Sequence, residues 1–476
     1  MTSWNPPLTH RPLRAANRSN AATRKLAIPV EWLLGVHELA MGRPTVNLSR
    51  HLFASQHQSP EAISARQLSS LRALIDLARS QSPYYRQLGL PTSEQLTGVD
   101  DLITVPMLSR ETLAAHAHEM CVDPPTHRRL RDHSSGSTGP AVTYYWDRLR
   151  QAWDKANRIR GHAWLGFAAG DRELHLWPID AAHTRGAKFR EALRSRRDAF
   201  VGDLLIDSNG DTPGATIWHR WRQFDPARMT AFPSRLCELI QSARRQGCRL
   251  FSPSLRCVFL TGEVTHAWQK SMIERELGVA TSQCYGVQEA GAIAFACEQG
   301  AWHTCAESVV VEFIRDGRPA RAGELAEVVV TSLVNRTMPV IRYRTGDLVR
   351  VAESIPCRCD RGLPVMPHIL GRFGDFLVSA SGEWIEPGRV LARVGEVLQP
   401  GSFQVMQSPT GRIEIYVAEG PQPRSDWRDA VIQRIATLAG PEVPITIRRV
   451  PHLSRCASGK LRYVQSQLSP ATATPS

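Results

Sequence analysis

A short run of glycine and hydroxyl-bearing residues is the first stretch of this sequence that could do chemistry. Its members are Ser134, Ser135, Gly136, Ser137, Thr138 and Gly139. Glycine tolerates positive φ angles and close approach, so the backbone N–H groups of such a loop can converge on a phosphate. A plain surface turn has the same composition. No lysine follows the second glycine, which excludes the common P-loop pattern, so the rest of the chain must decide between the two interpretations.

Four further motifs follow this loop in order. They are Thr261-Gly262-Glu263, Tyr285-Gly286-Val287-Gln288-Glu289, Tyr343-Arg344-Thr345-Gly346-Asp347 with Gly371-Arg372 after it, and Ser458-Gly459-Lys460. Each motif is weak alone, because an ordinary strand-to-helix turn, a solvated acid or a surface ion pair explains it equally well. Lys460 is one of only five lysines in the chain, so a chance surface lysine is a poor explanation for it.

Hydrophobic periodicity predicts the framework that positions these motifs. Between residues 95 and 370, strands expected at 174–177, 255–260 and 327–331 alternate with helices expected at 150–164, 233–245 and 268–277. A further strand is expected at 141–146, directly after the glycine-rich loop and Pro140. This is an α/β pattern, and α/β sheets bind ligands beyond the carboxyl ends of their strands, which is where Gly262 and Glu263 fall.

The pattern changes on both sides of this region. Residues 26–88 have helical spacing with a break at Ser82-Pro83, and after Arg372 we expect strands at 403–407, 413–417 and 445–450 with a helix at 425–439. The sequence therefore predicts a disordered tail at 1–24 and a large N-terminal domain with a helical lead-in at 25–372. A small, mobile α+β C-terminal domain follows at 373–466, with a second disordered tail at 467–476.

Composition limits the class of protein. A chain of 476 residues with 42% hydrophobic and 22% charged residues is typical of a soluble globular protein with two or three domains. It has no apolar run long enough to span a membrane and no secretory signal, so we expect a cytoplasmic protein with reduced cysteines. The net charge of +13 favours anionic ligands, although an arginine-rich genome explains it as well. No basic-aromatic pattern supports nucleic-acid binding.

In this order and spacing, the motifs resemble those of the adenylate-forming superfamily. Within it they are most similar to the phenylacetate–coenzyme A ligase family, particularly its capsule-biosynthesis-like branch, over residues 30 to 465. The resemblance implies an enzyme that activates a small carboxylic acid with ATP to an acyl-adenylate and releases pyrophosphate. The acyl group would then pass to coenzyme A or to the thiol of an acyl carrier protein. The family also suggests a homodimer.

The resemblance also implies a role for each motif. Ser134 to Gly139 would hold the β- and γ-phosphates, Gly262-Glu263 and Tyr285-Gly286 would lie at the adenine, and Glu289 would hold Mg²⁺. Asp347 would accept hydrogen bonds from the ribose hydroxyls, with Arg372 as a second ribose or phosphate contact. Lys460 would stabilise the charge that builds up between the α-phosphate and the attacking carboxylate.

Three positions depart from the family pattern. Pro140-Ala141 stand where relatives carry Lys-Pro, Gln288 replaces a threonine, and Gly374 replaces the usual Asp or Lys of the hinge. Glycine can absorb a large φ/ψ change, so rotation at this hinge is retained. The departures keep two alternatives open: an adenylate-forming enzyme with an amine or hydroxyl acceptor, and a degenerate member that binds nucleotide without turnover.

Four more residues have the chemistry of a metal site. Cys297, His303, Cys357 and Cys359 would complete a closed tetrahedral zinc site, which would be structural rather than catalytic. Buried, inert cysteines are the competing interpretation, and Cys305 could replace one ligand. The acid pocket is expected around Trp177, residues 232–234, Thr261 and residues 285–292, where aromatic side chains suggest a flat aromatic or medium-sized acid or simple packing.

Overall fold

The structure is a computed structural model of the chain. It describes residues 35–125, 129–133, 142–168, 170–177, 203–207, 214–248, 250–420, 426–456 and 459–468. The tail expected at 1–24, residues 469–476 of the tail expected at 467–476, and the glycine-rich loop at 134–139 lie outside these residues. Within them, no helix is both long enough and apolar enough to cross a membrane.

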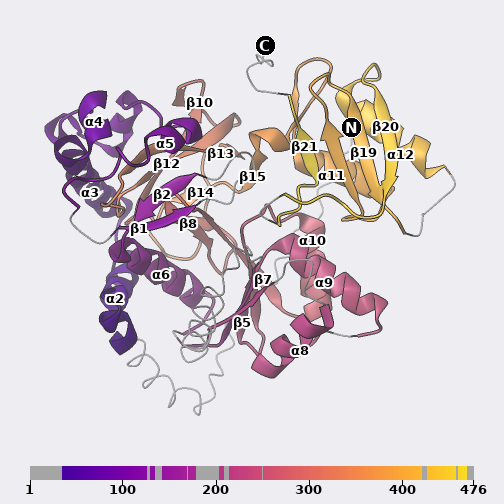
Figure 1. Cartoon of the computed structure of the whole chain (residues 1–476), viewed down its shortest axis with the longest axis horizontal. Coiled ribbons are helices and arrows are strands. Elements are labelled where there is room, and N and C mark those ends of the chain that lie inside the picture. Colours follow the sequence, from indigo (N-terminus) through magenta and orange to yellow (C-terminus); the bar gives the residue numbers. More distant parts are fainter. Residues whose placement is uncertain are drawn as a thin grey trace.

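Helices form the N-terminal part of the described chain (Figure 1). They are α2 (Thr45–Ser55), α3 (Pro60–Gln81), α4 (Pro83–Leu88) and α5 (Arg110–His116), with 3-10 turns at Ser93–Gln95 and Val99–Thr104. Helix α3 begins after Ser59, whose side chain accepts a hydrogen bond from the backbone N–H of Ala62, and Pro60 suits the first helical position. It ends at the predicted break, because Pro83 begins a new helix.

An eight-stranded sheet lies at the centre of the molecule. Its order is β14-β9-β8-β7-β6-β5-β3-β4, and β4, β3, β5, β6 and β7 run parallel. The strands are β3 (Glu173–Trp177), β4 (Asp203–Asp207), β5 (Arg228–Ala231), β6 (Cys257–Leu260), β7 (Ala280–Val287), β8 (Gly291–Ala296), β9 (Trp302–Thr304) and β14 (Val365–Met366). Helices α6 (Arg148–Ala163), α8 (Gly214–Phe224), α9 (Pro233–Arg245) and α10 (Ala267–Leu277) accompany it. This is the ligand-binding α/β arrangement that the sequence predicts.

A five-stranded antiparallel sheet packs beside the first one. Its order is β11-β10-β12-β13-β15, with β10 (Val309–Arg315), β11 (Arg318–Pro319), β12 (Leu325–Ser332), β13 (Val340–Arg350) and β15 (Ile369–Arg372). A short hairpin of β1 (Leu130–His133) and β2 (Thr143–Trp146) brackets the glycine-rich loop. Residues of the five-stranded sheet and of α3 share one buried core, which joins the helical lead-in to the rest of the large domain.

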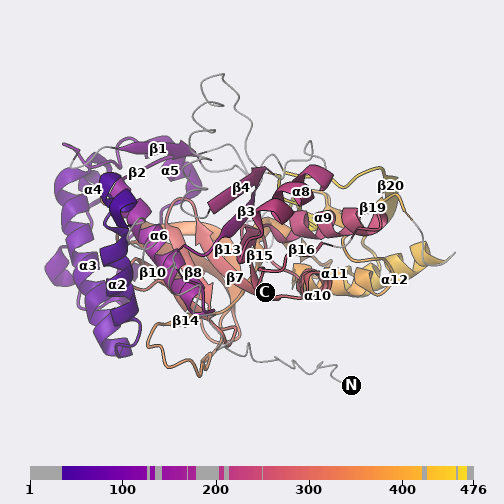
Figure 2. The ribbon, with the colours of Figure 1, turned by 90° about the horizontal axis from the view of Figure 1, so that it is seen from below.

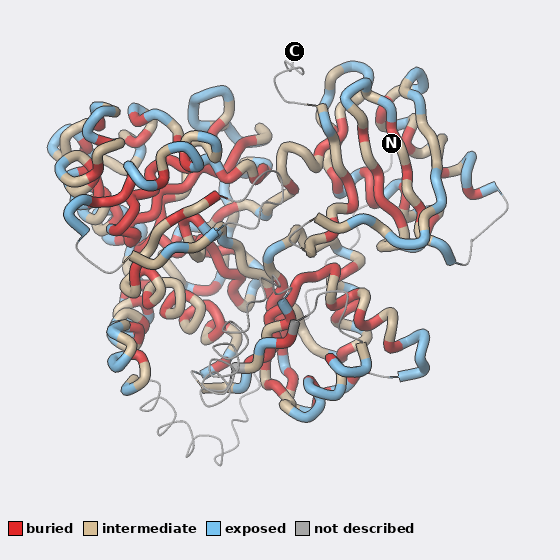
Figure 3. Tube along the Cα trace, viewed as in Figure 1, coloured by how far each residue is buried: buried red, intermediate tan, exposed pale blue. Residues whose placement is uncertain are grey.

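The C-terminal part, residues 373–466, has a core of its own. A four-stranded sheet in the order β20-β19-β18-β21 is formed by β18 (Phe403–Gln407), β19 (Ile413–Ala418), β20 (Ile445–Val450) and β21 (Val464–Ser466). Helices α11 (Pro387–Gly395) and α12 (Trp427–Ala439), the two-stranded sheet β16 (Leu377–Val378) and β17 (Trp384–Ile385), and the 3-10 turn Phe373–Asp375 complete it. Figures 1 and 2 show this part beside α9 and α10, and Figure 3 shows that buried residues follow its strands.

The observed elements agree closely with the predicted ones. The expected helix at 233–245 is α9, the helix at 150–164 is α6, and the strands at 403–407 and 445–450 are β18 and β20. The expected strand at 255–260 is shorter, because only Cys257–Leu260 pair with neighbours. The predicted α/β fold class, with a smaller α+β part at the C-terminus, is confirmed.

Candidate functional site

One cavity gathers the motifs from distant parts of the chain. Its volume is about 1360 Å³, and it lies between the eight-stranded sheet and the C-terminal part. Its walls include the sequence-predicted residues Gly262, Glu263, Tyr285, Gly286, Asp347, Arg372 and Lys460. These residues come from segments separated by up to about 200 positions, so the fold, rather than chain proximity, brings them together.

Gly262 occupies the turn directly after β6. Its φ is +77°, and a side chain built on it would lie 2.3 Å from the ring of Phe232, so the position requires glycine. The next residue, Glu263, accepts hydrogen bonds from the backbone N–H and the hydroxyl of Ser234, at 3.0 and 2.9 Å. Burial raises the pKa of Glu263. Through its two hydrogen bonds with Ser234, the carboxylate binds the first turn of α9, where the helix dipole favours a negative charge.

Tyr285, Asp347 and Arg372 form a hydrogen-bonded row on the cavity wall. The Tyr285 hydroxyl donates to Asp347 Oδ2 at 2.7 Å, and Arg372 Nε donates to Asp347 Oδ1 at 3.0 Å. Burial, followed by the charge of Asp347, raises the pKa of Tyr285 well above its usual range, so this hydroxyl is a donor. The charge of Asp347 likewise raises the pKa of Arg372. The row holds the carboxylate in one orientation.

The ring of Tyr285 is supported from behind. It stacks on Trp302 with 6.1 Å between ring centroids and 21° between planes, and His368 meets Trp302 edge-on at 4.8 Å. Gly286 lets the hairpin between β7 and β8 close, since a Cβ there would lie 2.6 Å from the carbonyl oxygen of Gly291. The aromatic wall that the sequence predicts at Tyr285 is thus held rigidly on the cavity side of β7.

Lys460 reaches the same cavity from the C-terminal part. Its Nζ lies 5.6 Å from the centre of the Phe232 ring, a cation–π distance. Burial, followed by the positive charge of Arg372, lowers the pKa of Lys460. Beside it, the backbone N–H of Leu461 donates to Glu263 Oε1 at 3.0 Å. The C-terminal part therefore touches the large domain at this lysine and at the residue after it.

Among the described residues predicted to hold ATP or Mg²⁺, Glu289 does not line this cavity. It is buried at 5% exposure, and its Oε1 lies 3.6 Å from Nη1 of Arg110 on α5. Tyr343, the first residue of the Tyr343–Asp347 motif, contacts the same pair. The contact of Arg110 with Glu289 is not predictable from the sequence, because nothing in the sequence connects α5 with the motif at 285–289.

The glycine-rich loop, Ser134 to Gly139, falls outside the described residues, as does the departure at Pro140. Its flanks are described: His133 pairs with Thr143, and their side chains meet at 3.1 Å between Nδ1 and Oγ1. Asp147 after β2 caps α6 through the N–H of Arg150 and accepts from the buried Thr337 hydroxyl. A hairpin therefore holds the two ends of the loop together.

The four predicted metal ligands form a cluster. Cys297, His303, Cys357 and Cys359 place their ligand atoms within 4.8 Å of one another, with separations of 3.6 Å for Cys297–Cys357, 3.4 Å for His303–Cys357 and 3.1 Å for His303–Cys359. His303 Nδ1 lies 3.0 Å from the carbonyl oxygen of Leu363, which directs Nε2 toward the sulfurs. Cys305 is not among the four.

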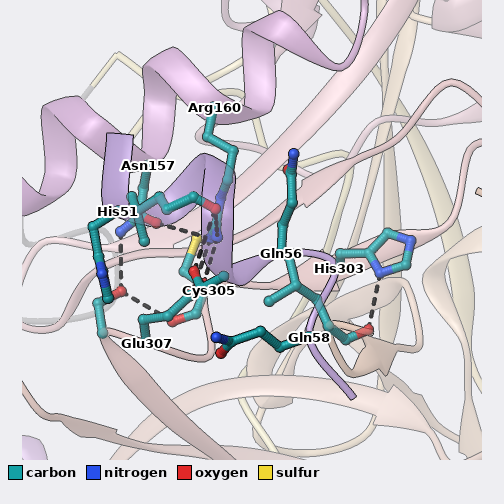
Figure 4. A network of polar contacts seen from close by, with 12 residues as sticks. His51, Gln56, Gln58, Asn157, Arg160, His303, Cys305 and Glu307 are labelled. Carbon is teal, nitrogen blue, oxygen red and sulfur yellow. Dashed lines mark hydrogen bonds and ion pairs between the residues drawn. The ribbon is translucent and has the colours of Figure 1, made fainter. Parts of the chain in front are cut away.

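A buried polar network lies next to this cluster and accounts for the position of Cys305 outside it. Arg160 on α6 donates to Glu307 at 2.7 and 3.1 Å and to Asn157 at 3.1 Å, and Cys305 lies beside it (Figure 4). Ser55 at the end of α2 also donates to Glu307. Because Arg160 and Glu307 are each 1% exposed and paired, the network joins α2, α6 and the large domain and is structural.

Comparison with solved structures defines the class of fold. A 2-hydroxyisobutyryl-CoA ligase in the postadenylation state superimposes with a TM-score of 0.67 at 18% identity, covering 85% of this chain and 89% of that one. The same ligase in the thioesterification state gives 0.55 at 19% identity, with 88% and 92% covered. No family model matches the chain. The fold is that of the adenylate-forming CoA ligases.

Sequence relatives point to one family among the proteins with this fold. The phenylacetate–coenzyme A ligase of Thermus thermophilus is 25% identical over 85% of this chain and 96% of its own length. Those of Pseudomonas putida and Escherichia coli are 26% and 33% identical over 67% and 33% of this chain, which is 73% and 37% of their own lengths. The predicted resemblance to the phenylacetate–coenzyme A ligase family is thereby confirmed. The narrower capsule-biosynthesis-like branch stays a prediction.

Proposed function

We propose that this protein activates a small carboxylic acid with ATP to an acyl-adenylate, releases pyrophosphate and transfers the acyl group to a thiol, with coenzyme A as the acceptor. One observation carries the proposal: Tyr285, Asp347, Arg372 and Lys460 meet in a single cavity beside the Gly262–Glu263 turn. The relatives named phenylacetate–coenzyme A ligase support the thiol acceptor. An acyl carrier protein would offer the same thiol chemistry.

The chain's own residues would position ATP rather than react with it. Asp347, oriented by Tyr285 and Arg372, would accept hydrogen bonds from the ribose hydroxyls, and the Tyr285 ring would flank the adenine. Lys460 would lie between the α-phosphate and the acid. A cation placed where negative charge accumulates stabilises the transition state more than the ground state, which is how it would accelerate the attack.

Magnesium would be held at Glu289. A single carboxylate together with phosphate oxygens satisfies this ion, which would neutralise charge on the phosphates. The donor chemistry of Glu289 therefore fits Mg²⁺. When nucleotide binds, the carboxylate of Glu289 would either contact both Arg110 and the ion or leave Arg110 for the ion.

The cysteine–histidine cluster fits zinc. With Zn–S bonds near 2.3 Å in a tetrahedron, sulfurs are about 3.8 Å apart, close to the 3.6 Å between Cys297 and Cys357 and far from a disulfide bond. The carbonyl of Leu363 supplies the outer contact that zinc-binding histidines usually make. Cys297, His303, Cys357 and Cys359 would hold a structural zinc that joins β9 to the 357–363 segment.

Exchange of labelled pyrophosphate into ATP, measured across a panel of carboxylic acids that includes phenylacetate, tests the proposal. We expect acid-dependent exchange that Lys460→Ala reduces by about 100-fold or more, because a transition-state contact is lost. Arg448→Ala is the matched control, since Arg448 pairs with Glu414 on the C-terminal part outside the cavity. Nucleotide binding without exchange for any acid would favour the degenerate member instead.

A further inference from the structure

The loop that carries Lys460 is fastened at several points. On the C-terminal part, the buried side chain of Gln404 on β18 bonds both stems of the loop: its Nε2 donates to the carbonyl oxygens of Ser454 and Arg462, each at 2.8 Å, and its Oε1 accepts from Ser454 N at 2.8 Å. Within the loop, Cys456 N donates to Lys460 O at 3.0 Å. The described residues 454–456 and 459–462 are therefore joined to β18 and to each other as one hydrogen-bonded unit.

Two carboxylates of the large domain hold this unit from the other side. Glu238 on α9 pairs with the guanidinium of Arg455, five residues before the lysine, and Glu263 accepts from the N–H of Leu461, one residue after it. Arg455 also donates to the carbonyl oxygen of Gly459, so the residue that Glu238 holds supports the backbone next to Lys460. Glu263 is in turn fixed by Ser234, one helical turn before Glu238 on α9.

We propose that Glu238 and Glu263 form a latch that holds the Lys460 loop in its adenylating position, so that Glu263 is a positioning residue for Lys460 rather than a nucleotide contact. This rests on the proposed function, because the latch matters only if Lys460 serves the adenylation step. The carboxylate of Glu263 already accepts hydrogen bonds from Ser234 N, the Ser234 hydroxyl and Leu461 N, which use three of its roughly four acceptor positions and direct it toward α9 and the Lys460 loop.

The latch has a consequence for the two half-reactions. Adenylation requires Lys460 in the cavity and so gains from the latch. Formation of the thioester from a preformed acyl-adenylate does not use these contacts, and it should not depend on Glu238. A merely structural role for Glu238 would instead lower both half-reactions together.

Glu238→Gln tests this, with Glu414→Gln as the matched control, because Glu414 pairs with Arg448 within the C-terminal part. Pyrophosphate exchange measures adenylation with the acid that serves the unmodified protein best, and release of AMP from synthetic acyl-adenylate plus coenzyme A measures thioester formation. We expect exchange to fall about two- to fivefold in Glu238→Gln, the range for a partly exposed ion pair, with thioester formation unchanged. In an Arg455→Gln background the same substitution should add no further loss.

Hydrogen–deuterium exchange supplies a readout without turnover. The amide of Leu461 should exchange faster in Glu238→Gln than in the unmodified protein, while Glu414→Gln leaves it unchanged. Equal loss in both half-reactions, or no loss in either together with unchanged exchange at Leu461, would overturn the latch. If the unmodified protein activates no acid, the proposed function fails, and exchange at Leu461 still decides whether Glu238 holds the loop.

Discussion

At the scale of single residues, Lys460 lies among charges of both signs in the cavity. Arg372 repels it, whereas Glu263 and Asp347 attract it. The ring of Phe232 lies beneath its ammonium group. Within the described part of the chain no carboxylate forms an ion pair with Lys460, and its side chain is half-buried, so the ammonium group is available to a negatively charged substrate.

The lowered pKa of Lys460 predicts the alkaline limb of the pH profile. Burial, followed by the charge of Arg372, lowers this pKa from the usual 10.5. As the pH rises, the lysine of the free enzyme should therefore lose its proton before pH 10.5 is reached, and adenylation activity should fall with it. Between the lowered pKa and 10.5 the unfolded chain binds more protons than the native one, so the contribution of this group to the free energy of unfolding rises with pH across that window.

The measurement is kcat/KM for ATP in the exchange assay against pH. In Lys460→Arg, whose guanidinium stays protonated, residual activity should lack this limb. An unchanged alkaline limb in Lys460→Arg would assign it to another group.

Much of the residue-level site could be predicted from the sequence, because short motifs carry both the residue type and its turn. The motifs predicted that Tyr285, Asp347, Arg372 and Lys460 act at one site, and the four residues line one cavity. Arg110, Trp302 and Glu238 could not be predicted, since each reaches its partner only through the fold and none lies in a recognisable motif.

At the scale of elements, the cysteine–histidine cluster joins a strand to a loop. His303 lies on β9, which pairs with β14 at Val365, while Cys357 and Cys359 lie on the loop before β14. Trp302, the neighbour of His303 on the same strand, supports Tyr285. The spacing of the cluster in sequence is irregular, so its ligands were identifiable but its closure depended on the pairing of these two strands.

Loss of one ligand should release the metal and loosen this region. We expect Cys357→Ser to lose stoichiometric zinc and to lower the melting temperature by about 5 °C or more, as removing a structural metal site usually does. Cys305→Ser is the control, because Cys305 is buried but outside the cluster. Elemental analysis and thermal unfolding measure both effects. Equal zinc contents in the two variants, or no zinc in the unmodified protein, would contradict the assignment.

At the scale of the whole molecule, residues 373–375 connect the two parts. Asp375 accepts from the N–H of Arg372 at 2.8 Å and from Arg462 Nε at 2.7 Å, so the connection is bonded both to the large domain and to the segment after Lys460. The separate core of the C-terminal part, with Trp268 of α10 packed against it, suits a unit that turns as a body. Composition and periodicity predicted this division, but the contacts across it are tertiary and could not be read from the sequence.

A stiffened connection should affect the second half-reaction more than the first. Proline fixes φ and removes an N–H, so Gly374→Pro should slow thioester formation by about tenfold while pyrophosphate exchange stays within about twofold. Gly374→Ala is the matched control, since the added Cβ would lie 3.1 Å from the end of the Arg462 side chain and 3.6 Å, an ordinary contact distance, from the carbonyl oxygen of Ser466. Equal slowing of both half-reactions in Gly374→Pro would argue against rotation at this position.

The central claim is that the carboxylate of the acid attacks the α-phosphate of ATP. The most direct test supplies the best acid of the panel with both carboxylate oxygens replaced by ¹⁸O, together with ATP and coenzyme A, and analyses the products by mass spectrometry. Attack at the α-phosphate leaves the bridging oxygen on the nucleotide when the thiol takes the acyl group, so we predict AMP that carries one ¹⁸O atom. Label in inorganic phosphate alongside ADP would mean attack at the γ-phosphate and would contradict the account.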